Sequence, residues 1–426
     1  KVSCDAFRRQ LCILPTPFAL TCSTYMYSMY CAVFEEPGYW IWLGSLFDSF
    51  SRIPSSTTIN MKSAILFGTV ALASAASDHK NFPRTWKDFK DGQDKGNMDG
   101  LFARYLDTFD KSYNHVERIE YFSVFKERLQ SIFAWNEDKD SHTYVKGITA
   151  YTDLSEAQRF GMGVMPTTPA TKAAAKKSPK ARDYKTKTIE SFANQDVCDM
   201  RPYTTSIKNQ GSCGSCWAFG TMAAGEASHW LWSMTSADGN VTTPASDAWQ
   251  LAEQVLVECC SSEGGCGGGG TAGPMQCAVD MSALPSAISH PYTAKDTASC
   301  QEDNSQASAS VMSWYMPCDD GDEACLKTLI GGNTCTQFAT TALKTSIEVI
   351  DSFYDYVDGV YSDPACPSDK HNHAVAIVGW GTDEETNEDY WIMRNSWGTD
   401  WGMDGYFYMQ RGTNMCCVGC ANLFFQ

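Results

Sequence analysis

The stretch Gln210-Gly-Ser-Cys-Gly-Ser-Cys216-Trp-Ala-Phe-Gly220 surrounds one cysteine with glycine, serine and tryptophan, and it places a glutamine six residues before that cysteine. Two further motifs follow along the chain, Asn372-His-Ala374 and Asn395-Ser-Trp-Gly398. Cysteine, histidine and asparagine in this order are the residue types of a thiol nucleophile, its base and the group that orients the base. These three motifs therefore predict an active site assembled from distant parts of the chain.

Each of these residues also has an ordinary structural explanation. Cys216 could be half of a disulfide, His373 could fill space in the core of a strand, and Asn395 could belong to a turn. The joint occurrence of all three, each inside its own local motif, favours the active-site interpretation.

The chemistry of a thiol site assigns a role to each residue. A thiolate is the nucleophile, so the pKa of Cys216 must be lowered. A helix that begins at Cys216 would favour negative charge through its dipole, and a protonated His373 would do so by Coulomb attraction. We expect Asn395 to hold the imidazole in plane. We expect the amide of Gln210 to stabilise an oxyanion together with the backbone N–H of Cys216.

The bulk composition limits the class of protein. The chain of 426 residues is long enough for two or three compact units, and its net charge is −17. Residues 193–426 carry 8 basic and 29 acidic side chains. A region this acidic would repel phosphates, so nucleic acid is not an expected partner. Acidic surfaces also aid solubility, which is the simpler explanation for most of these charges.

The cysteines cluster in the same region. Of 19 cysteines, four precede residue 61 and fifteen follow residue 197. When Cys216 is set aside, fourteen remain, an even number that is typical of a disulfide-bonded extracellular or lumenal domain with one free thiol. Zinc binding is the alternative, but no two Cys-x2-Cys units stand at zinc-ribbon spacing.

The N-terminal part resembles targeting sequence. Residues 61–76 combine one lysine, a short apolar run and small residues at the end, which predicts a signal peptide cleaved near Ala75 or Ala76. Residues 1–60 are then interpreted as upstream sequence that does not belong to the native protein. The alternative is a membrane-spanning segment in the uncharged run 11–34, although the prolines in this run disfavour a transmembrane helix.

Three regions follow the signal peptide. Residues 77–164 are expected to be mostly helical, with one helix over 116–137. Six residues spaced three or four apart would form a stripe along one face of this helix: Glu117, Tyr121, Phe125, Arg128, Ile132 and Asn136. Residues 165–192 are rich in Pro, Ala, Thr and Lys and are expected to form an exposed linker that a protease could cut. In residues 193–426 a helix precedes strands such as 374–379 and 390–394, so an α part and a β part are expected.

Residues 193–426 resemble the mature domain of a papain-like cysteine peptidase, and residues 77–164 resemble its inhibitory prosegment. The helical stripe is similar to the family's ERFNIN pattern, and Gly147-x-Thr-x-Tyr-x-Asp153 is similar to its GNFD motif. The resemblance implies an α+β fold with a helical part, a β-barrel-like part and a cleft between them, preceded by a mostly helical prosegment. It implies that Gln210, Cys216, His373 and Asn395 are catalytic and that no metal or organic cofactor is needed.

The resemblance also implies further site residues. Trp397 would shield the hydrogen bond between the histidine and the asparagine. Three disulfides would join Cys213 to Cys266, Cys259 to Cys300 and Cys366 to Cys416. Eight cysteines then remain with undetermined connectivity: Cys198, Cys260, Cys277, Cys318, Cys325, Cys335, Cys417 and Cys420.

Substrate contacts are implied in the same way. The backbone of Gly268 and Gly269 would pair with an extended peptide. Ser346 and Ala421 would line the subsite for the second residue before the cleaved bond (P2), and Glu348 lies close to them in sequence. Gly270 and Thr271 replace the aromatic and the proline that the family often has, so one wall of this subsite is undetermined. Asn240 in Asn-Val-Thr is a possible glycan acceptor.

The expected activity is that of a secreted or lysosome-like endopeptidase proform. Its partners would be protein or peptide substrates and its own prosegment, and we expect a monomer that is not inserted in a membrane after signal removal. A dipeptide-removing exopeptidase is less favoured because no histidine lies between His290 and His371. Two further classes of protein share these residue types, a catalytically silent relative and a thiol acyltransferase.

The spacing of the catalytic residues indicates an insertion. Cys216 and His373 are 157 residues apart, more than the family's usual spacing, and the extra residues are expected within 303–335.

Overall fold

The computed structural model divides into two units, Lys1–Ala76 and Ser77–Gln426. It describes residues 78–161, 168–169, 184–189, 192, 196–241, 246–281, 283–296, 299–300, 307–311 and 313–426, together with four strands nearer the N-terminus. Apart from those strands, the upstream region 1–60 and the signal peptide 61–76 lie outside the described residues, so both remain predictions. Among the helices of the described residues, none has the length and apolar character needed to cross a membrane.

The first unit contains one antiparallel sheet. Its four strands pair in sequence order: β1 (Leu11–Ile13), β2 (Ala19–Tyr25), β3 (Ser28–Glu35) and β4 (Tyr39–Leu43). Each strand is hydrogen-bonded to its neighbour in the chain, as in a meander of hairpins.

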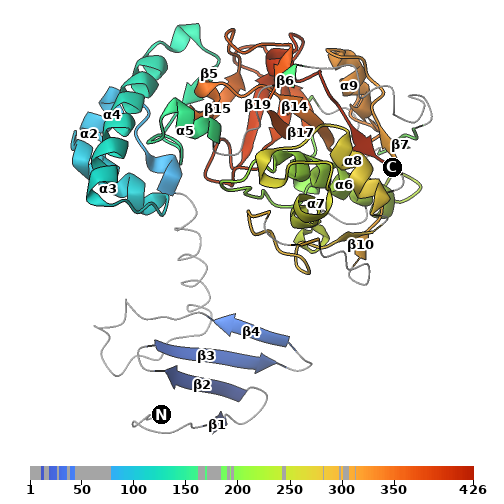
Figure 1. Cartoon of the computed structure of the whole chain (residues 1–426), viewed down its shortest axis with the longest axis horizontal. Helices are drawn as coiled ribbons and strands as arrows, with labels where there is room; N and C mark the ends of the chain where they lie inside the picture. The colour runs from blue at the N-terminus through green and yellow to red at the C-terminus, as the bar shows by residue number, and fades with distance from the viewer. Residues whose placement is uncertain are drawn as a thin grey trace. The chain divides into compact units, whose positions relative to one another are not determined.

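The second unit combines helices with a mixed sheet (Figure 1). Its α-helices are α2 (Trp86–Asp91), α3 (Met98–Thr108), α4 (His115–Glu137), α5 (Glu156–Gly161), α6 (Cys216–Ser233), α7 (Glu253–Cys259), α8 (Gly273–Asp280) and α9 (Glu323–Leu329). Its short 3-10 helices are η1 (Asp78–Asn81), η2 (Lys139–Ser141), η5 (Arg201–Tyr203), η6 (Asp247–Trp249), η7 (Gly265–Gly267), η9 (Asp351–Asp355) and η10 (Met415–Cys417).

The largest sheet of this unit has seven strands. Its order is β14 (Leu343–Ile347), β17 (His373–Thr382), β18 (Asp389–Arg394), β19 (Tyr406–Gln410), β15 (Tyr356–Tyr361) and β5 (Tyr144–Lys146), with β8 (Cys198–Asp199) also paired to β17. The remaining strands form short pairs or triplets: β6 (Thr168–Pro169), β7 (Lys187–Thr188), β9 (Leu284–Pro285), β10 (Ala307–Ala309), β11 (Trp314–Tyr315), β12 (Ile330–Gly331), β13 (Gln337–Phe338), β16 (Lys370–His371) and β20 (Phe424–Phe425).

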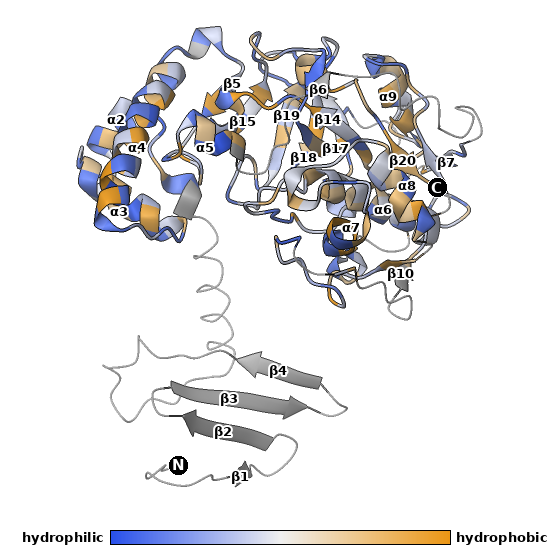
Figure 2. Cartoon of the chain, in the orientation of Figure 1, coloured by the Kyte–Doolittle hydropathy of each residue, from blue (hydrophilic) through white to orange (hydrophobic). Residues whose placement is uncertain are grey.

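The helical segment 78–161 has its own aromatic core. Phe102 and Tyr105 of α3 pack against Phe125 of α4, with ring centroids about 5 Å apart in each pair. Asn114 caps α4 by accepting from two backbone N–H groups, and Glu117 accepts from the backbone of Asn114 in return. Hydrophilic and hydrophobic residues both occur along α3 and α4 (Figure 2), as befits helices packed on one side.

The stripe predicted for α4 lies where the sequence pattern placed it. Phe125, Ile132 and Asn136 are buried. Asn136 donates to the backbone oxygen of Lys146 and accepts from its N–H, and Arg128 is paired with Asp351. The stripe therefore joins α4 to the rest of the unit, and the spacing prediction of a helix over 116–137 is confirmed.

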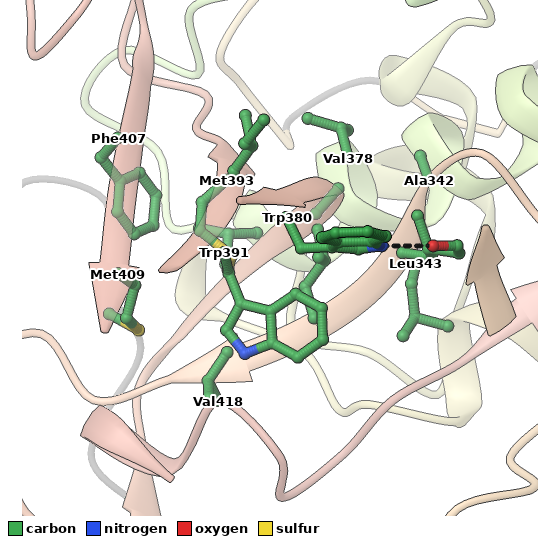
Figure 3. Packing of buried hydrophobic residues seen from close by; sticks show 14 of the residues in the cluster. Ala342, Leu343, Val378, Trp380, Trp391, Met393, Phe407, Met409 and Val418 are labelled. Carbon is green, nitrogen blue, oxygen red and sulfur yellow. Dashed lines mark hydrogen bonds between the residues drawn. The ribbon is translucent and has the colours of Figure 1, made fainter. Parts of the chain in front are cut away.

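Two hydrophobic cores lie on either side of α6. One contains Trp217 of α6 together with residues of α7 and α8. The other lies on the sheet, where Trp391, Phe407 and Met409 of neighbouring strands pack together (Figure 3). In the same cluster the indole N–H of Trp380 donates to the backbone oxygen of Ile330. The expected α+β fold with a helical part and a sheet part is confirmed.

The helical segment is joined to the sheet by strand pairing. β5 pairs antiparallel with β15, and the backbone N–H of Gly147 donates to the oxygen of Asp355 at 2.8 Å. A β-carbon on Gly147 would approach a methyl carbon of Val357 to 2.7 Å, so only glycine allows the two backbones to lie this close. The segment therefore extends the sheet rather than merely resting on it.

The expected exposure of the linker 165–192 is wrong for its last residues. Ile189 is fully buried and Phe192 is 4% exposed. β7 pairs with β13, and the N–H of Ile189 donates to Thr336. The mean composition of the linker hides these two apolar side chains, which suffice to pack its end against the sheet core.

The disulfides tie together the region from residue 196 onward. Cys213 is joined to Cys266, Cys259 to Cys300 and Cys366 to Cys416, the same pairs that the resemblance implied. The eight cysteines left open form four further bonds: Cys198–Cys335, Cys260–Cys277, Cys318–Cys325 and Cys417–Cys420. Within 303–335, one disulfide closes a loop before α9 and another ties the end of that region to β8.

Candidate active site

Cys216 is the first residue of α6, and its side chain is fully buried. Burial raises the pKa of its thiol to about 11, although the backbone N–H of Ala374 acts in the opposite direction. Because Ala374 directly follows His373 in β17, this contact places the thiol beside the histidine. A helix N-terminus at the thiol adds a favourable dipole, as the sequence motif predicted.

His373 and Asn395 form the second part of the site. The imidazole Nε2 lies 2.8 Å from the side-chain oxygen of Asn395, and both residues are buried. Burial lowers the pKa of His373 to about 4, whereas the hydrogen bond that its Nε2–H donates to Asn395 raises it. The Nδ1 atom has no hydrogen-bond partner among the described residues, so it is available to a proton from the thiol.

Trp397 lies over this pair. The centroid of its indole is 5.0 Å from that of the His373 imidazole. The position agrees with the shielding role that the resemblance implied, because an indole here keeps water from the hydrogen bond between His373 and Asn395.

Gln210 lies next to the same residues. Its side-chain oxygen accepts from the hydroxyl of Ser396 at 2.6 Å, and its amide nitrogen donates to the backbone oxygen of Cys213 at 2.9 Å. The structure thus holds the amide group between the loop before Cys216 and the residue after Asn395. All four predicted catalytic residues occupy one place in the fold.

Tyr292 contacts the site, and the sequence reasoning missed it. Its hydroxyl donates to the backbone oxygen of Gln210 at 2.9 Å and is hydrogen-bonded to the hydroxyl of Ser215 at 2.6 Å. Tyr292 therefore links the glutamine loop to the residue that precedes Cys216. No local sequence pattern reveals this contact, because the two ends are about 80 residues apart.

A buried charge network supports the site from behind. Lys208 is paired with Glu226 of α6 at 2.7 Å and also with Glu253 of α7. Arg394, which precedes Asn395, lies 3.6 Å from the other oxygen of Glu226. A buried charge requires a partner, so this network fixes α6 relative to β18. The sequence motifs gave no indication of it.

The glycine strip follows η7. Gly268 has a φ of 116°, a left-handed conformation that favours glycine, and its oxygen accepts from Gly264. A β-carbon on Gly269 would approach the indole of Trp217 to 2.7 Å. The strip therefore lies directly against the nucleophile helix, where extended substrate backbone could pair with it.

The residues expected around the P2 side chain lie on or next to β14, the edge strand of the seven-stranded sheet. Ser346 of β14 is the strand partner of Ala374 and is buried. Ala421 is 7% exposed and lies two residues before Leu423, which is bridged to Lys344. Glu348 is also buried, and its N–H donates to Cys416. Lys344, which sequence reasoning missed, is on the same strand as Ser346.

The helical segment and its continuation cover this neighbourhood. β6 (168–169) pairs with β16 (370–371), two residues before His373. The ring of Tyr151 lies 5.2 Å from the indole of Trp397. The possible glycan acceptor Asn240 is exposed and its amide donates to Asp238, but Thr242 of the same motif lies outside the described residues.

Comparison with known proteins identifies a protease family and a propeptide domain. Residues 193–424 match the model of the "Papain family cysteine protease", and residues 102–158 match the "Cathepsin propeptide inhibitor domain (I29)". The chain is 33% identical to thiol protease aleurain of Arabidopsis thaliana over 331 residues, which cover 75% of this chain and 82% of the relative. It is 30% identical to pro-cathepsin H of Mus musculus over 329 residues, 75% of this chain and 89% of the relative.

Solved structures agree with the sequence relatives. Digestive procathepsin L 3 of Tenebrio molitor larval midgut superposes with a TM-score of 0.61 at 27% sequence identity. The superposition covers 77% of this chain and 99% of that protein.

Proposed function

Because the chain belongs to the papain family of cysteine proteases and carries a cathepsin propeptide inhibitor domain, we propose that it is the proform of an endopeptidase with Cys216 as nucleophile. In this proposal His373 is the base, Asn395 orients the base and Gln210 stabilises the oxyanion. The observation that carries it is the contact of the Cys216 thiol with the residue after His373, while the other side of His373 is held by Asn395 at 2.8 Å.

The reaction follows from these positions. The Cys216 sulfur gives its proton to Nδ1 of His373 and attacks the peptide carbonyl carbon. The carbonyl oxygen becomes negative and accepts from the Cys216 N–H and the Gln210 amide. His373 then protonates the leaving amine, which leaves a thioester. Water gives a proton to His373 and attacks the thioester, which releases the acid product and the Cys216 thiolate; the thiolate then takes the proton back from His373.

The intact proform is expected to be inactive. At neutral pH a thiol with a pKa of about 11 and an imidazole with a pKa of about 4 are both uncharged. Both shifts are caused by burial, and removal of the covering segment would return water to the site. Hydration would lower the pKa of Cys216 and raise that of His373, so the reactive ion pair would form only after processing.

The helical segment is well placed to be the inhibitor. It adds β5 to the sheet, and its buried Arg159 is paired with Asp355. Protonation of such carboxylates in acid would weaken these ion pairs and favour release of the segment. The bounds 77–164 for the prosegment, secretion, and an acidic compartment remain parts of this proposal. So do a glycan on Asn240 and substrate contacts of Gly268 and Gly269.

Internal cleavage is favoured over removal of terminal dipeptides. The region 196–426 contains no histidine between His290 and His371. It therefore lacks the adjacent histidines that dipeptide-removing members of the family, such as cathepsin B, carry on the loop called the occluding loop. Protein and peptide substrates could then extend through the site in both directions.

Labelling by a thiol-directed epoxide tests the proposal. We expect one adduct per acid-processed chain, located at Cys216 by mass spectrometry, and no adduct in the proform or in His373→Ala. Folded, processed protein that is not labelled at Cys216 would instead support a catalytically silent relative. Product analysis with an added amine separates hydrolysis from acyl transfer.

A further inference from the structure

Lys344 is a fully buried lysine in the strand β14. Its ammonium donates to the hydroxyl of Thr221 and to the backbone oxygen of Thr271, each at 2.9 Å. Among the residues that the structure describes, no carboxylate lies within ion-pair distance of this ammonium. A buried ammonium normally requires an opposite charge, so a lysine held only by neutral oxygens calls for an explanation.

The ammonium lies between the nucleophile helix and the glycine strip. A β-carbon on Gly220 of α6 would be 3.3 Å from Cγ of Lys344, and Gly220 follows Cys216 by one helical turn. Thr271 directly follows the glycines 267–270. Lys344 thus extends beneath the place where the strip would hold the substrate backbone, close to the nucleophile.

A second polar group lies on the same face of the strand. Ser346 is two residues from Lys344, so the two side chains leave β14 in the same direction. The hydroxyl of Ser346 is buried without a hydrogen-bond partner among the described residues. Ser346 shares this face with its strand partner Ala374. A β-carbon on Gly220 would lie 3.5 Å from Cβ of Ala374, so this face of β14 packs against the nucleophile helix α6.

We propose that Lys344 is a specificity-determining residue that selects substrates with an acidic side chain at P2, with the Ser346 hydroxyl as a second donor. The inference rests on the proposed function, because it concerns the subsite next to the same nucleophile. An ammonium has three N–H donors, and Thr221 and Thr271 occupy two of them. A glutamate carboxylate at P2 would accept from the third and neutralise the buried charge.

The charge state of Lys344 fits acidic conditions. Burial lowers its pKa to about 7, while Glu263 and Cys216 act in the opposite direction. At pH 5.5 the ammonium is therefore charged, and a substrate glutamate is mostly ionised as well. A P2 arginine would meet a like charge, and a P2 leucine would cover the ammonium without offering an acceptor.

Peptides that differ only at P2 test the proposal. The acid-processed enzyme is assayed at pH 5.5 with four fluorogenic peptides that carry glutamate, glutamine, leucine or arginine at P2. We expect kcat/KM for glutamate to equal or exceed that for leucine and to exceed that for arginine at least tenfold. A wild-type profile in which leucine exceeds glutamate tenfold or more would overturn the proposal without any variant.

Two variants refine the test. Lys344→Met should lower the ratio of kcat/KM for glutamate to that for leucine at least tenfold, while Cys216 is still labelled by the epoxide. Lys327→Met is the matched control, because Lys327 lies on α9 over the indole of Trp380, and it should leave the ratio unchanged. An equal loss for all four peptides in Lys344→Met would mean that the lysine acts on the thiol instead, which contradicts the proposal. Absence of both labelling and cleavage in the wild type would refute the proposed function itself.

Discussion

The guanidinium of Arg159 and the carboxylate of Asp355 meet at 2.6 Å in a place that solvent hardly reaches, with side-chain exposures of 0% and 5%. Arg159 belongs to α5, at the end of the helical segment 78–161, and Asp355 belongs to η9 of the protease domain. The same guanidinium is 3.3 Å from Asp351, which is also paired with Arg128 of α4. The helical segment is therefore joined to the protease domain by a charge network whose centre, the pair of Arg159 with Asp355, is buried and whose outer members are partly exposed.

Asp355→Asn should destabilise the proform. The substitution leaves the buried guanidinium of Arg159 without its main partner, which typically costs about 3–5 kcal/mol. Urea denaturation at neutral pH measures this loss, and processing should begin at a higher pH than in the wild type. Asp91→Asn is the control, because the pair of Asp91 with Lys87 is fully exposed, and it should change neither measurement. Equal stability of both variants would contradict the importance of the buried pair.

Alkylation of Cys216 should depend on pH over different ranges before and after processing. In the proform the thiol pKa of about 11 leaves roughly one thiol in ten thousand ionised at pH 7, so the iodoacetamide rate should rise about tenfold per pH unit up to that value. In the processed protein the water-exposed thiol should react well below pH 7. Identical pH profiles for the two forms would show that burial by the propeptide does not control the thiol.

His373→Ala should reduce kcat by roughly 10²–10⁴-fold, the usual contribution of a general base. Loss of the base leaves the fold intact, since within the described part of the chain its hydrogen bond to Asn395 is the one polar contact of the ring. His229→Ala at the other end of α6 serves as control and should keep kcat near that of the wild type. Comparable activity of the two variants would remove His373 from the mechanism.

Processing should leave the new N-terminus at or before Tyr184. Residues 184–189 and Phe192 pack against the protease domain through β7, Ile189 and Phe192 itself, so a cut among them would expose buried apolar surface. Mass spectrometry of the processed protein identifies the terminus. A form that begins at residue 193 should be less stable by about 1.5–3 kcal/mol for each large apolar side chain lost. Recovery of a stable enzyme that begins at residue 193 would contradict this prediction.

The sequence predicted those parts of the site that depend on short motifs. The helix at Cys216, the strand predicted over 374–379 and the stripe on α4 each follow from neighbouring residues, and the structure has all three, with the strand running from His373 to Thr382. Local pattern is informative here because capping, helix periodicity and strand alternation act over a few residues.

The contacts that the sequence could not predict join distant residues. The hydroxyl of Tyr292 meets Gln210 across 82 positions, and the ammonium of Lys344 meets Thr221 across 123. Nothing near Lys344 in the chain distinguishes a buried lysine from a solvent-exposed one, because its partners come from other elements. The same limit explains the linker, whose average composition concealed the burial of Ile189.

From residue 196 onward, every cysteine except Cys216 is joined in one of seven disulfides. Production of the protein in a reducing cytosol would therefore leave up to fourteen additional sulfhydryls, any of which could pair wrongly. A sulfhydryl count on the denatured, unreduced protease domain therefore measures how completely the disulfides have formed. A value of one per molecule indicates a preparation with the correct number of bonds, and a higher value reveals incomplete oxidation before any activity is assayed.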